Sequence, residues 1–84
     1  MPPRARKLIK SVHSGENADF CAEMIQARKK AGLTQETLAS RLKRPQSFVA
    51  KYEGGERRLD VIEFLAITKA MGADPLRLIK RLIR

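Results

Sequence analysis

Residues 34–52 read TQETLASRLKRPQSFVAKY, and the first half of this stretch has the pattern of a short helix. Thr34 can cap that helix, because its side-chain oxygen accepts a hydrogen bond from a backbone N–H that has no partner in the first turn. Leu38 and Leu42 then fall on one face at helical spacing. We therefore expect a helix over residues 35–42 with one apolar face.

The second half of the stretch begins another helix after a break of two basic residues. Pro45 is favourable at the first helical position, because it has no N–H to leave unbonded and its φ already suits a helix. Val49 and Tyr52 share a face further along, so we expect this helix over residues 45–53. The break is too short for antiparallel packing around a long loop, which predicts two helices crossing at about 90–120°, a helix-turn-helix.

Capping and terminating residues outside this stretch predict three more helices. No segment alternates between apolar and polar residues for long enough to indicate a strand. We therefore expect an all-α domain of five helices over residues 14–84. The three further helices are expected from Ser14 to about Ala31, before Gly32; from Val61 to Met71, between Asp60 and Gly72; and over residues 75–83, after Asp74.

The chain is strongly basic, since 18 Lys and Arg residues against 9 Asp and Glu residues give its 84 residues a net charge of +9. Such a charge attracts polyanions, of which nucleic acid is the commonest and an anionic membrane surface the main competitor. Residues 1–13 carry several of these cations and two prolines, so we interpret them as a flexible basic N-terminal arm. The alternative is a chain end without function.

Several classes of protein do not fit the composition. Cys21 and His13 are the only residues of their kinds, whereas a structural zinc site needs about four such ligands, so we expect no metal, cofactor or disulfide framework. We also expect no enzyme, because the sequence shows no nucleophile–base set, phosphate-binding glycine loop or paired carboxylates. We expect no secretory signal, because the first residues lack a long apolar run, and the longest uncharged apolar run, residues 64–68, is far below the ~20 residues that span a bilayer. We expect a soluble, cytoplasmic protein.

The segment GLTQETLASRLKRPQSFVAKYEGGERRLDVIEFLAITKAMG, from Gly32 to Gly72, resembles the Cro/C1-type helix-turn-helix domain of the XRE family. The resemblance implies a lambda-repressor-like fold and a DNA-binding transcriptional regulator, a repressor or autoregulator. It rests on residues that all fall at family spacing, namely Leu33-Thr34-Gln35, Leu38-Ala39, Val49, Tyr52-Glu53, Gly55 and Ala70-Met71-Gly72.

In that family the second helix of the motif lies in the major groove of double-stranded DNA, and its first residues read base edges. Here these residues are Pro45, Gln46 and Ser47, followed by Ala50 and Lys51 one turn on. Gln46 is the best candidate for a base contact, because its amide can bond adenine N6 and N7 together. Ala50 could contact a thymine methyl, and Lys51 a guanine or a phosphate. The alternative for Gln46 and Lys51 is a solvated side chain.

The resemblance also assigns residues that do not read bases. It implies that Gln35 contacts the DNA backbone and braces the recognition helix, and that Arg28 and Glu53 form a partly buried ion pair with a structural role. Contacts to phosphates fix the register of a protein on DNA without reading its sequence. We expect such contacts from Thr34, Gln35, Lys43, Arg44, Arg57 and Arg58.

Three positions depart from the family pattern. Lys43 stands in the turn where glycine is common, and glycine suits a left-handed backbone there. Arg44 occupies the expected cap position of the second helix, where Ser or Thr is usual and can accept a hydrogen bond. Phe48 stands where the family tends to have a polar residue, so it either packs sideways on a neighbouring helix or touches the sugar–phosphate backbone.

The last helix carries more apolar residues than a small core needs, which suggests a partner surface. We expect a homodimer through this helix, together with Ile62 or Ala66, that places two recognition helices about 34–36 Å apart on a pseudo-palindromic site. The alternative is that the helix completes a monomer core. The expected dimerisation residues are Leu76, Ile79, Leu82 and Ile83.

Other functions remain open at this stage. The chain could be an antitoxin or a protein-interaction module that keeps the fold, with DNA binding secondary, and control by an unseen protein partner is compatible with both. Membrane binding through the arm or the basic last helix is a third hypothesis, with Arg77, Lys80, Arg81 and Arg84 as the basic residues. The sequence favours DNA over these alternatives because the basic residues flank the recognition helix.

Overall fold

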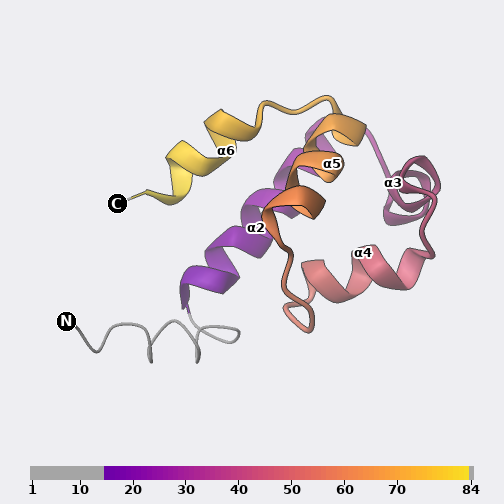
Figure 1. The fold of residues 1–84 in the computed structure, drawn as a ribbon, viewed down its shortest axis with the longest axis horizontal. Coiled ribbons are helices and arrows are strands. Elements are labelled where there is room, and N and C mark those ends of the chain that lie inside the picture. The colour runs from indigo at the N-terminus through magenta and orange to yellow at the C-terminus, as the bar shows by residue number, and fades with distance from the viewer. Residues whose placement is uncertain (1–14, 84) are drawn as a thin grey trace.

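The computed structural model describes residues 15–83, and within them the chain forms five helices and no strand (Figure 1). The prediction of an all-α fold is confirmed. The expected arm over residues 1–13 and the cap at Ser14 lie outside the described residues. The helices are α2 (Gly15–Lys30), α3 (Gln35–Leu42), α4 (Gln46–Glu53), α5 (Val61–Met71) and α6 (Pro75–Leu82).

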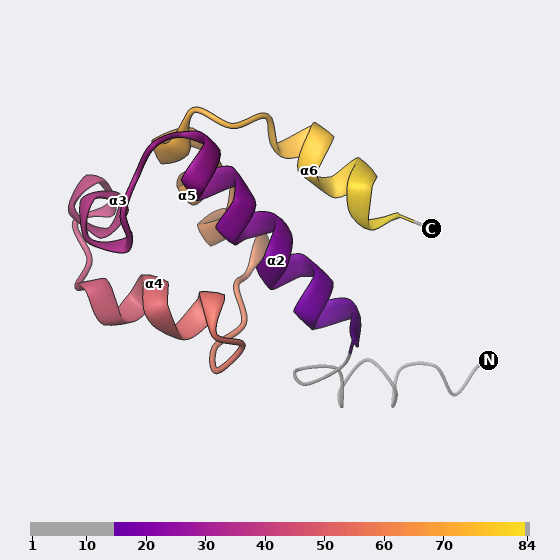
Figure 2. The ribbon, with the colours of Figure 1, turned by 180° about the vertical axis from the view of Figure 1, so that it is seen from behind.

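The long helix α2 runs through the middle of the domain beside α5, with α3 and α4 at one end and α6 at the other (Figures 1 and 2). In both views α3 is seen nearly end-on while α4 lies across the view, so the two helices cross as expected for a helix-turn-helix. On α2 and α5, the rings of Phe20 and Phe64 pack with their centroids 5.9 Å apart. The helix-turn-helix is therefore held on a frame made by α2 and α5.

The core collects one or more large side chains from every one of these helices. Each such side chain stabilises the fold by roughly 1.5–3 kcal/mol relative to exposure. Leu38 and Val49 are fully shielded from solvent, which fits their expected inward positions on the two helices of the motif. The buried apolar cluster consists of Met24, Leu38, Ala39, Phe48, Val49, Tyr52, Phe64, Ile67, Met71 and Leu78.

The start of α3 is fixed by reciprocal hydrogen bonds between two threonines. The Thr37 backbone N–H donates to the Thr34 hydroxyl at 3.0 Å, and the Thr34 backbone N–H donates to the Thr37 hydroxyl at 2.8 Å. This is a capping box, with threonine in the place where glutamate or glutamine is usual. The predicted cap at Thr34 is confirmed.

The turn between the motif helices contains a left-handed residue that is not glycine. Lys43 has a φ of 57°, and no other non-glycine residue in the described part of the chain has a positive φ. The Lys43 N–H donates to the carbonyl of Ser40, and the next N–H, of Arg44, donates to that of Ala39. The tight turn thus bonds the free carbonyls at the end of α3, at the cost of a strained backbone at Lys43.

The start of α4 corrects the sequence-based boundary. Pro45 is not the first helical residue but the N-cap, because its ψ of 154° is extended. Its carbonyl accepts the first helical hydrogen bond, from the Phe48 N–H at 3.0 Å. Arg44 therefore lies one residue before the cap instead of on it, and α4 has no side-chain cap, since proline offers no acceptor.

The ends of the other helices follow their predicted signals closely. The Asp60 side chain accepts from the Glu63 N–H, and the Asp74 side chain accepts from the Leu76 N–H. Gly32 and Gly72 end α2 and α5 with φ values of 74° and 71°, which glycine adopts without strain. Helix α6 ends at Leu82, one residue before the expected end, because Ile83 is extended.

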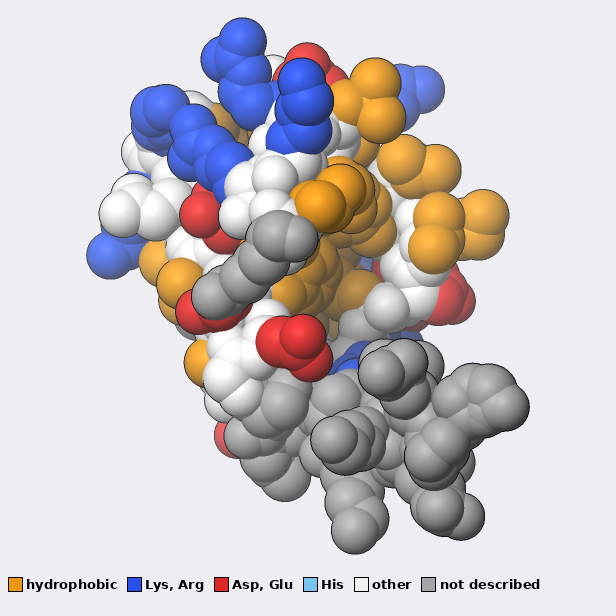
Figure 3. All heavy atoms as spheres, turned by 90° about the vertical axis from the view of Figure 1, so that its left-hand side faces the viewer, with side chains coloured by type: hydrophobic (Ala, Val, Ile, Leu, Met, Phe, Trp, Pro, Cys, Tyr) orange, Lys and Arg blue, Asp and Glu red, His pale blue; other side chains and the backbone are white. Residues whose placement is uncertain are grey.

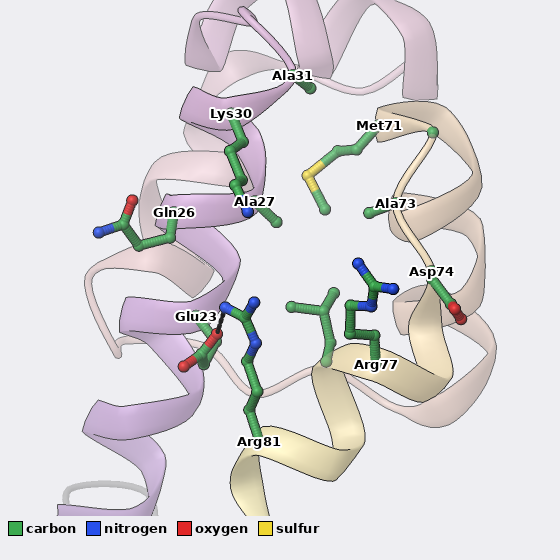
Figure 4. A pocket seen from close by; sticks show the side chains of 12 residues that line it. Glu23, Gln26, Ala27, Lys30, Ala31, Met71, Ala73, Asp74, Arg77 and Arg81 are labelled. Atoms are coloured by element: carbon green, nitrogen blue, oxygen red, sulfur yellow. Dashed lines mark hydrogen bonds and ion pairs between the residues drawn. The ribbon is translucent and has the colours of Figure 1, made fainter.

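Helix α6 is attached to the rest of the domain on one side only. Leu78 is its single buried side chain, and Arg81 pairs with Glu23 of α2 across 3.4 Å. A pocket of about 540 Å³ remains between the two helices. Lys30, Arg77 and Arg81 are among the residues that line it (Figure 4). Leu76 and Ile79 of α6 are consequently left exposed to solvent.

The strained turn leads to a prediction about stability. The substitution Lys43→Gly should raise the free energy of unfolding by about 1 kcal/mol, because glycine adopts the left-handed conformation without a Cβ clash. The matched control Lys43→Ala removes the same charge but keeps the strain, so it should not stabilise. Chemical denaturation measures both, and equal stability of the glycine and alanine variants would contradict the expectation.

Candidate nucleic-acid interface

Helix α4 has one buried side and one exposed side. Phe48, Val49, Tyr52 and Glu53 are buried, at the i, i+1, i+4, i+5 spacing of a helix face. The remaining residues of the helix face solvent. The exposed set consists of Gln46, Ser47, Ala50 and Lys51, and Pro45 beside them is exposed as well.

This exposed face contains all the residues that were expected to read bases. It offers an amide at Gln46, a hydroxyl at Ser47, a methyl group at Ala50 and an ammonium at Lys51. An amide suits adenine, and a hydroxyl suits either kind of base pair. A methyl group suits the methyl of thymine, and an ammonium suits guanine. The chemistry of the face is therefore compatible with reading a DNA groove.

A buried ion pair fixes α4 to α2. Arg28 donates from Nε to Glu53 Oε2 at 2.7 Å and from Nη2 to Glu53 Oε1 at 3.2 Å, and the two side chains are only 11% and 4% exposed. The third guanidinium nitrogen donates to the Leu33 carbonyl at 2.8 Å. The pair expected from the family resemblance is thus present, and it also fastens the loop that leads into α3.

Gln35 connects this ion pair to the exposed face. Its Nε2 donates to Glu53 Oε1 at 2.9 Å, and its Oε1 accepts from Gln46 Nε2 at 3.3 Å. A continuous chain of polar contacts therefore runs from Arg28 through Glu53 and Gln35 to Gln46. The exposed amide of Gln46 is thereby connected to the buried ion pair.

The residues expected to contact the DNA backbone surround α4 but differ in their present partners. Lys43, Arg44 and Arg58 are exposed on the loops before and after the helix. Thr34 uses its hydroxyl in the capping box. Arg57 donates to Glu63 Oε2 at 2.8 Å and to Oε1 at 3.1 Å, so its guanidinium already has an anionic partner.

Phe48 packs inward, which decides between its two expected positions. Its side chain is 8% exposed and meets the Tyr52 ring edge-on at a centroid distance of 5.5 Å. The guanidinium groups of Arg44 and Arg57 lie over its ring. Glu63 was not among the candidate residues, although the spacing Asp60-x-x-Glu63 is a capping-box pattern that could have drawn attention to it.

Two titratable side chains, Cys21 and Tyr52, are buried behind the exposed face of α4. The Cys21 thiol donates to the Tyr52 carbonyl at 3.2 Å, and burial raises the pKa of this thiol. Burial also raises the pKa of Tyr52, with the nearby Glu53 carboxylate adding to the effect. Both groups therefore stay neutral at pH 7.

Among residues 15–83 there is no group of three or more potential metal ligands, and none of the helices is long and apolar enough to cross a bilayer.

The ion pair leads to a prediction about folding. The substitution Arg28→Met should lower the free energy of unfolding by about 3–5 kcal/mol, because it leaves the buried Glu53 carboxylate without its cation. The double variant Arg28→Met/Glu53→Met should be less destabilised than the single one. Lys29→Met, on an exposed neighbouring position, is the control and should change little. An Arg28→Met variant as stable as this control in chemical denaturation would show that the pair has no structural role.

Comparisons with known proteins agree with this geometry. The family model of the helix-turn-helix domain matches residues 20–79. An XRE-family like protein from Pseudomonas syringae pv. tomato str. DC3000 has a similar structure, with a TM-score of 0.79 and 46% identity over 94% of this chain and 93% of that one. The restriction-modification controller protein C.AhdI from Aeromonas hydrophila is also similar, with a TM-score of 0.71 and 29% identity over 79% of this chain and 96% of that one.

No curated protein sequence matches the chain. The family model nevertheless covers most of its length, and the first of the two solved structures aligns over almost all of it. Together with the crossed helices and the exposed face of α4, these matches establish the lambda-repressor-like fold. The chain belongs to the XRE family of helix-turn-helix DNA-binding regulators.

Proposed function

We propose that the protein binds double-stranded DNA with α4 in the major groove and acts as a repressor or autoregulator of transcription. The observation that carries this proposal is the exposed face of α4 together with its support. Gln46 is held through Gln35 by a buried ion pair, although nothing in the core requires a polar side chain at position 46. Such preparation of an exposed polar group is expected where it makes a defined contact.

In this proposal, residues on the exposed side of α4 read the base sequence of the DNA. Gln46 bonds the major-groove edge of an adenine, Ser47 and Lys51 contact neighbouring groups, and Ala50 and Pro45 pack against the groove. A bidentate contact from Gln46 would be worth roughly 1–3 kcal/mol of discrimination between bases. The other contacts add shape complementarity and fix the position of the helix in the groove.

The backbone is held by groups on both sides of α4. Basic residues neutralise phosphates and release counterions, which makes affinity fall with salt. Gln35 is half-buried beneath Gln46, so a free amide hydrogen can still reach a phosphate while the braces are kept. The proposed backbone contacts are Thr34, Gln35, Lys43, Arg44 and Arg58.

We further propose that the regulator is a homodimer. Leu76 of α6 and Ile83, which follows this helix, are 75% and 70% exposed, and Ile62 of α5 is 73% exposed. Hydrophobic side chains gather on one flank of the face where α6 lies (Figure 3). Burial of these side chains against a second copy would remove an unusually apolar surface from water. The proposed interface includes Leu76, Ile79, Leu82 and Ile83, together with the exposed Ile62 of α5.

The likeness to a restriction-modification controller protein supports a regulatory role in a small genetic circuit. Control by occupancy suits such a circuit, because the chain needs only to bind its site as its concentration rises. A symmetric dimer would recognise a pseudo-palindromic operator, with half-sites one helical turn apart. Selection of bound sequences from a random DNA pool tests the proposal directly, and the expected result is a two-fold symmetric motif.

The assignment of Gln46 is tested by its truncation. In the same selection, Gln46→Ala should lose preference at one base pair of each half-site, by roughly 5–150-fold, which corresponds to the 1–3 kcal/mol of a bidentate contact. Gln26→Ala removes an amide from an exposed site near α6 and serves as the matched control. If the Gln46→Ala motif equals the wild-type motif, another residue reads the sequence.

The dimer interface is tested by a charge placed on the apolar patch. Leu76→Glu should shift the protein to monomers in sedimentation experiments, because the carboxylate would be buried without a partner. Ser40→Glu adds the same charge to an exposed position on α3, at the other end of the domain, and should leave the dimer intact. A wild-type monomer, or a Leu76→Glu variant as dimeric as the control, would refute the proposed interface.

A further inference from the structure

Two arginines from opposite ends of α4 meet on one aromatic ring. Arg44 precedes α4 and Arg57 follows it, yet their Cζ atoms lie 4.6 Å and 4.9 Å from the centroid of the Phe48 ring. Both distances are within the range of a cation–π attraction. The ring itself is almost fully buried between these cations, Tyr52 and the helices behind it.

The two arginines differ in what else they contact. Arg57 forms a bidentate ion pair with Glu63, and its Nη1 also donates to the Arg58 carbonyl at 2.9 Å. The hydrogen bonds from Arg57 and from the Asp60 backbone lower the pKa of Glu63 to about 2. The charge of Arg57 is therefore matched by a carboxylate that stays ionised at any physiological pH.

Arg44 has no such partner. Within residues 15–83 its guanidinium makes the contact with the Phe48 ring and no hydrogen bond or ion pair, and the Arg44 side chain is exposed. It lies close enough to Glu63 for its charge to act on that carboxyl. The cluster thus holds two cations and one anion, and the unmatched positive charge has its donors free.

We propose that Phe48 and the Arg57–Glu63 pair form a support that holds Arg44 ready to bind a DNA phosphate beside the start of α4. In this arrangement Arg57 is a positioning residue and not a phosphate contact, which differs from the sequence-based assignment. The inference rests on the proposed function and deepens it by dividing the roles of the two arginines.

The electrostatics of the cluster favour this division. If Arg57 left Glu63 to bind a phosphate, the carboxylate of Glu63 would lose its partner close to the negatively charged DNA. Arg44 loses no protein partner on binding, and the attraction to the ring face leaves its N–H groups free for a bidentate phosphate contact. Glu63 also reduces the repulsion between two guanidinium groups that share one ring.

The salt dependence of DNA binding distinguishes the two arginines. Each neutralised phosphate contributes about 0.9 to the slope of log affinity against log salt concentration. Arg44→Ala should lower the steepness of that slope by about 0.9. The double variant Arg57→Gln/Glu63→Gln keeps the net charge and the capping box, and its slope should equal that of the wild type. Lys80→Ala, on α6, controls for the loss of one surface charge.

The outcome that overturns the proposal is a double variant whose slope falls as much as that of Arg44→Ala, since Arg57 would then be the phosphate contact. An unchanged slope for Arg44→Ala would overturn it as well. If the wild type binds no DNA at all, the proposed function fails instead.

A measurement without DNA tests the support by itself. Protons of the Arg44 side chain should show upfield ring-current shifts in NMR spectra of the free wild-type protein. These shifts should decrease in Phe48→Leu. They should also decrease in Arg57→Gln/Glu63→Gln, which leaves the core intact and so keeps the test available if Phe48→Leu does not fold. Random-coil shifts for Arg44 in the wild type would show that the ring does not hold it.

Discussion

The carboxylate of Glu53 is the group on which the rest of the structure depends. It is buried at the inner side of α4, and a buried charge is tolerated only where cations and hydrogen-bond donors surround it. Arg28 supplies the charge from α2, and Gln35 supplies a further donor from the first turn of α3. Three helices are thereby tied to one point, and the orientation of α4 follows from that point.

The same group connects folding to recognition. Gln35 donates to Glu53 from one end of its amide and accepts from Gln46 at the other end. The exposed end of α4 is consequently arranged by a contact that also stabilises the core. Helix α6, on which the proposed dimer interface lies, is at the end of the domain away from α3 and α4 (Figure 2). The exposed apolar side chains of α6 are therefore separate from the exposed face of α4.

Signals that act within a few residues could be predicted from the sequence. The caps at Thr34 and Asp60 and the left-handed glycines are local, so the helices were placed within about one turn. The start of α4 was wrong by one residue, because a proline serves both as a first helical residue and as an extended cap, and only its ψ distinguishes the two.

Contacts between distant residues could not be predicted in the same way. The exposed face of α4 follows from helical spacing, but the cluster of Arg44, Phe48, Arg57 and Glu63 joins four segments through their side chains. The ion pair of Arg28 and Glu53 was anticipated through the family resemblance, since nothing in the spacing of 25 residues pairs them. Long-range geometry of this kind depends on the packing of α2, α4 and α5.

A double-mutant cycle on DNA affinity tests most directly whether Gln35 and Gln46 act as one unit. Affinity for the selected operator is measured for Gln35→Ala, Gln46→Ala and the double variant under the same salt conditions. If Gln35 acts by holding Gln46, the two losses of affinity overlap. Adding Gln35→Ala to Gln46→Ala should then cost clearly less affinity than Gln35→Ala costs on its own. The coupling energy between the two substitutions should exceed about 0.5 kcal/mol. Strictly additive losses would contradict a shared role and show that the two glutamines act independently.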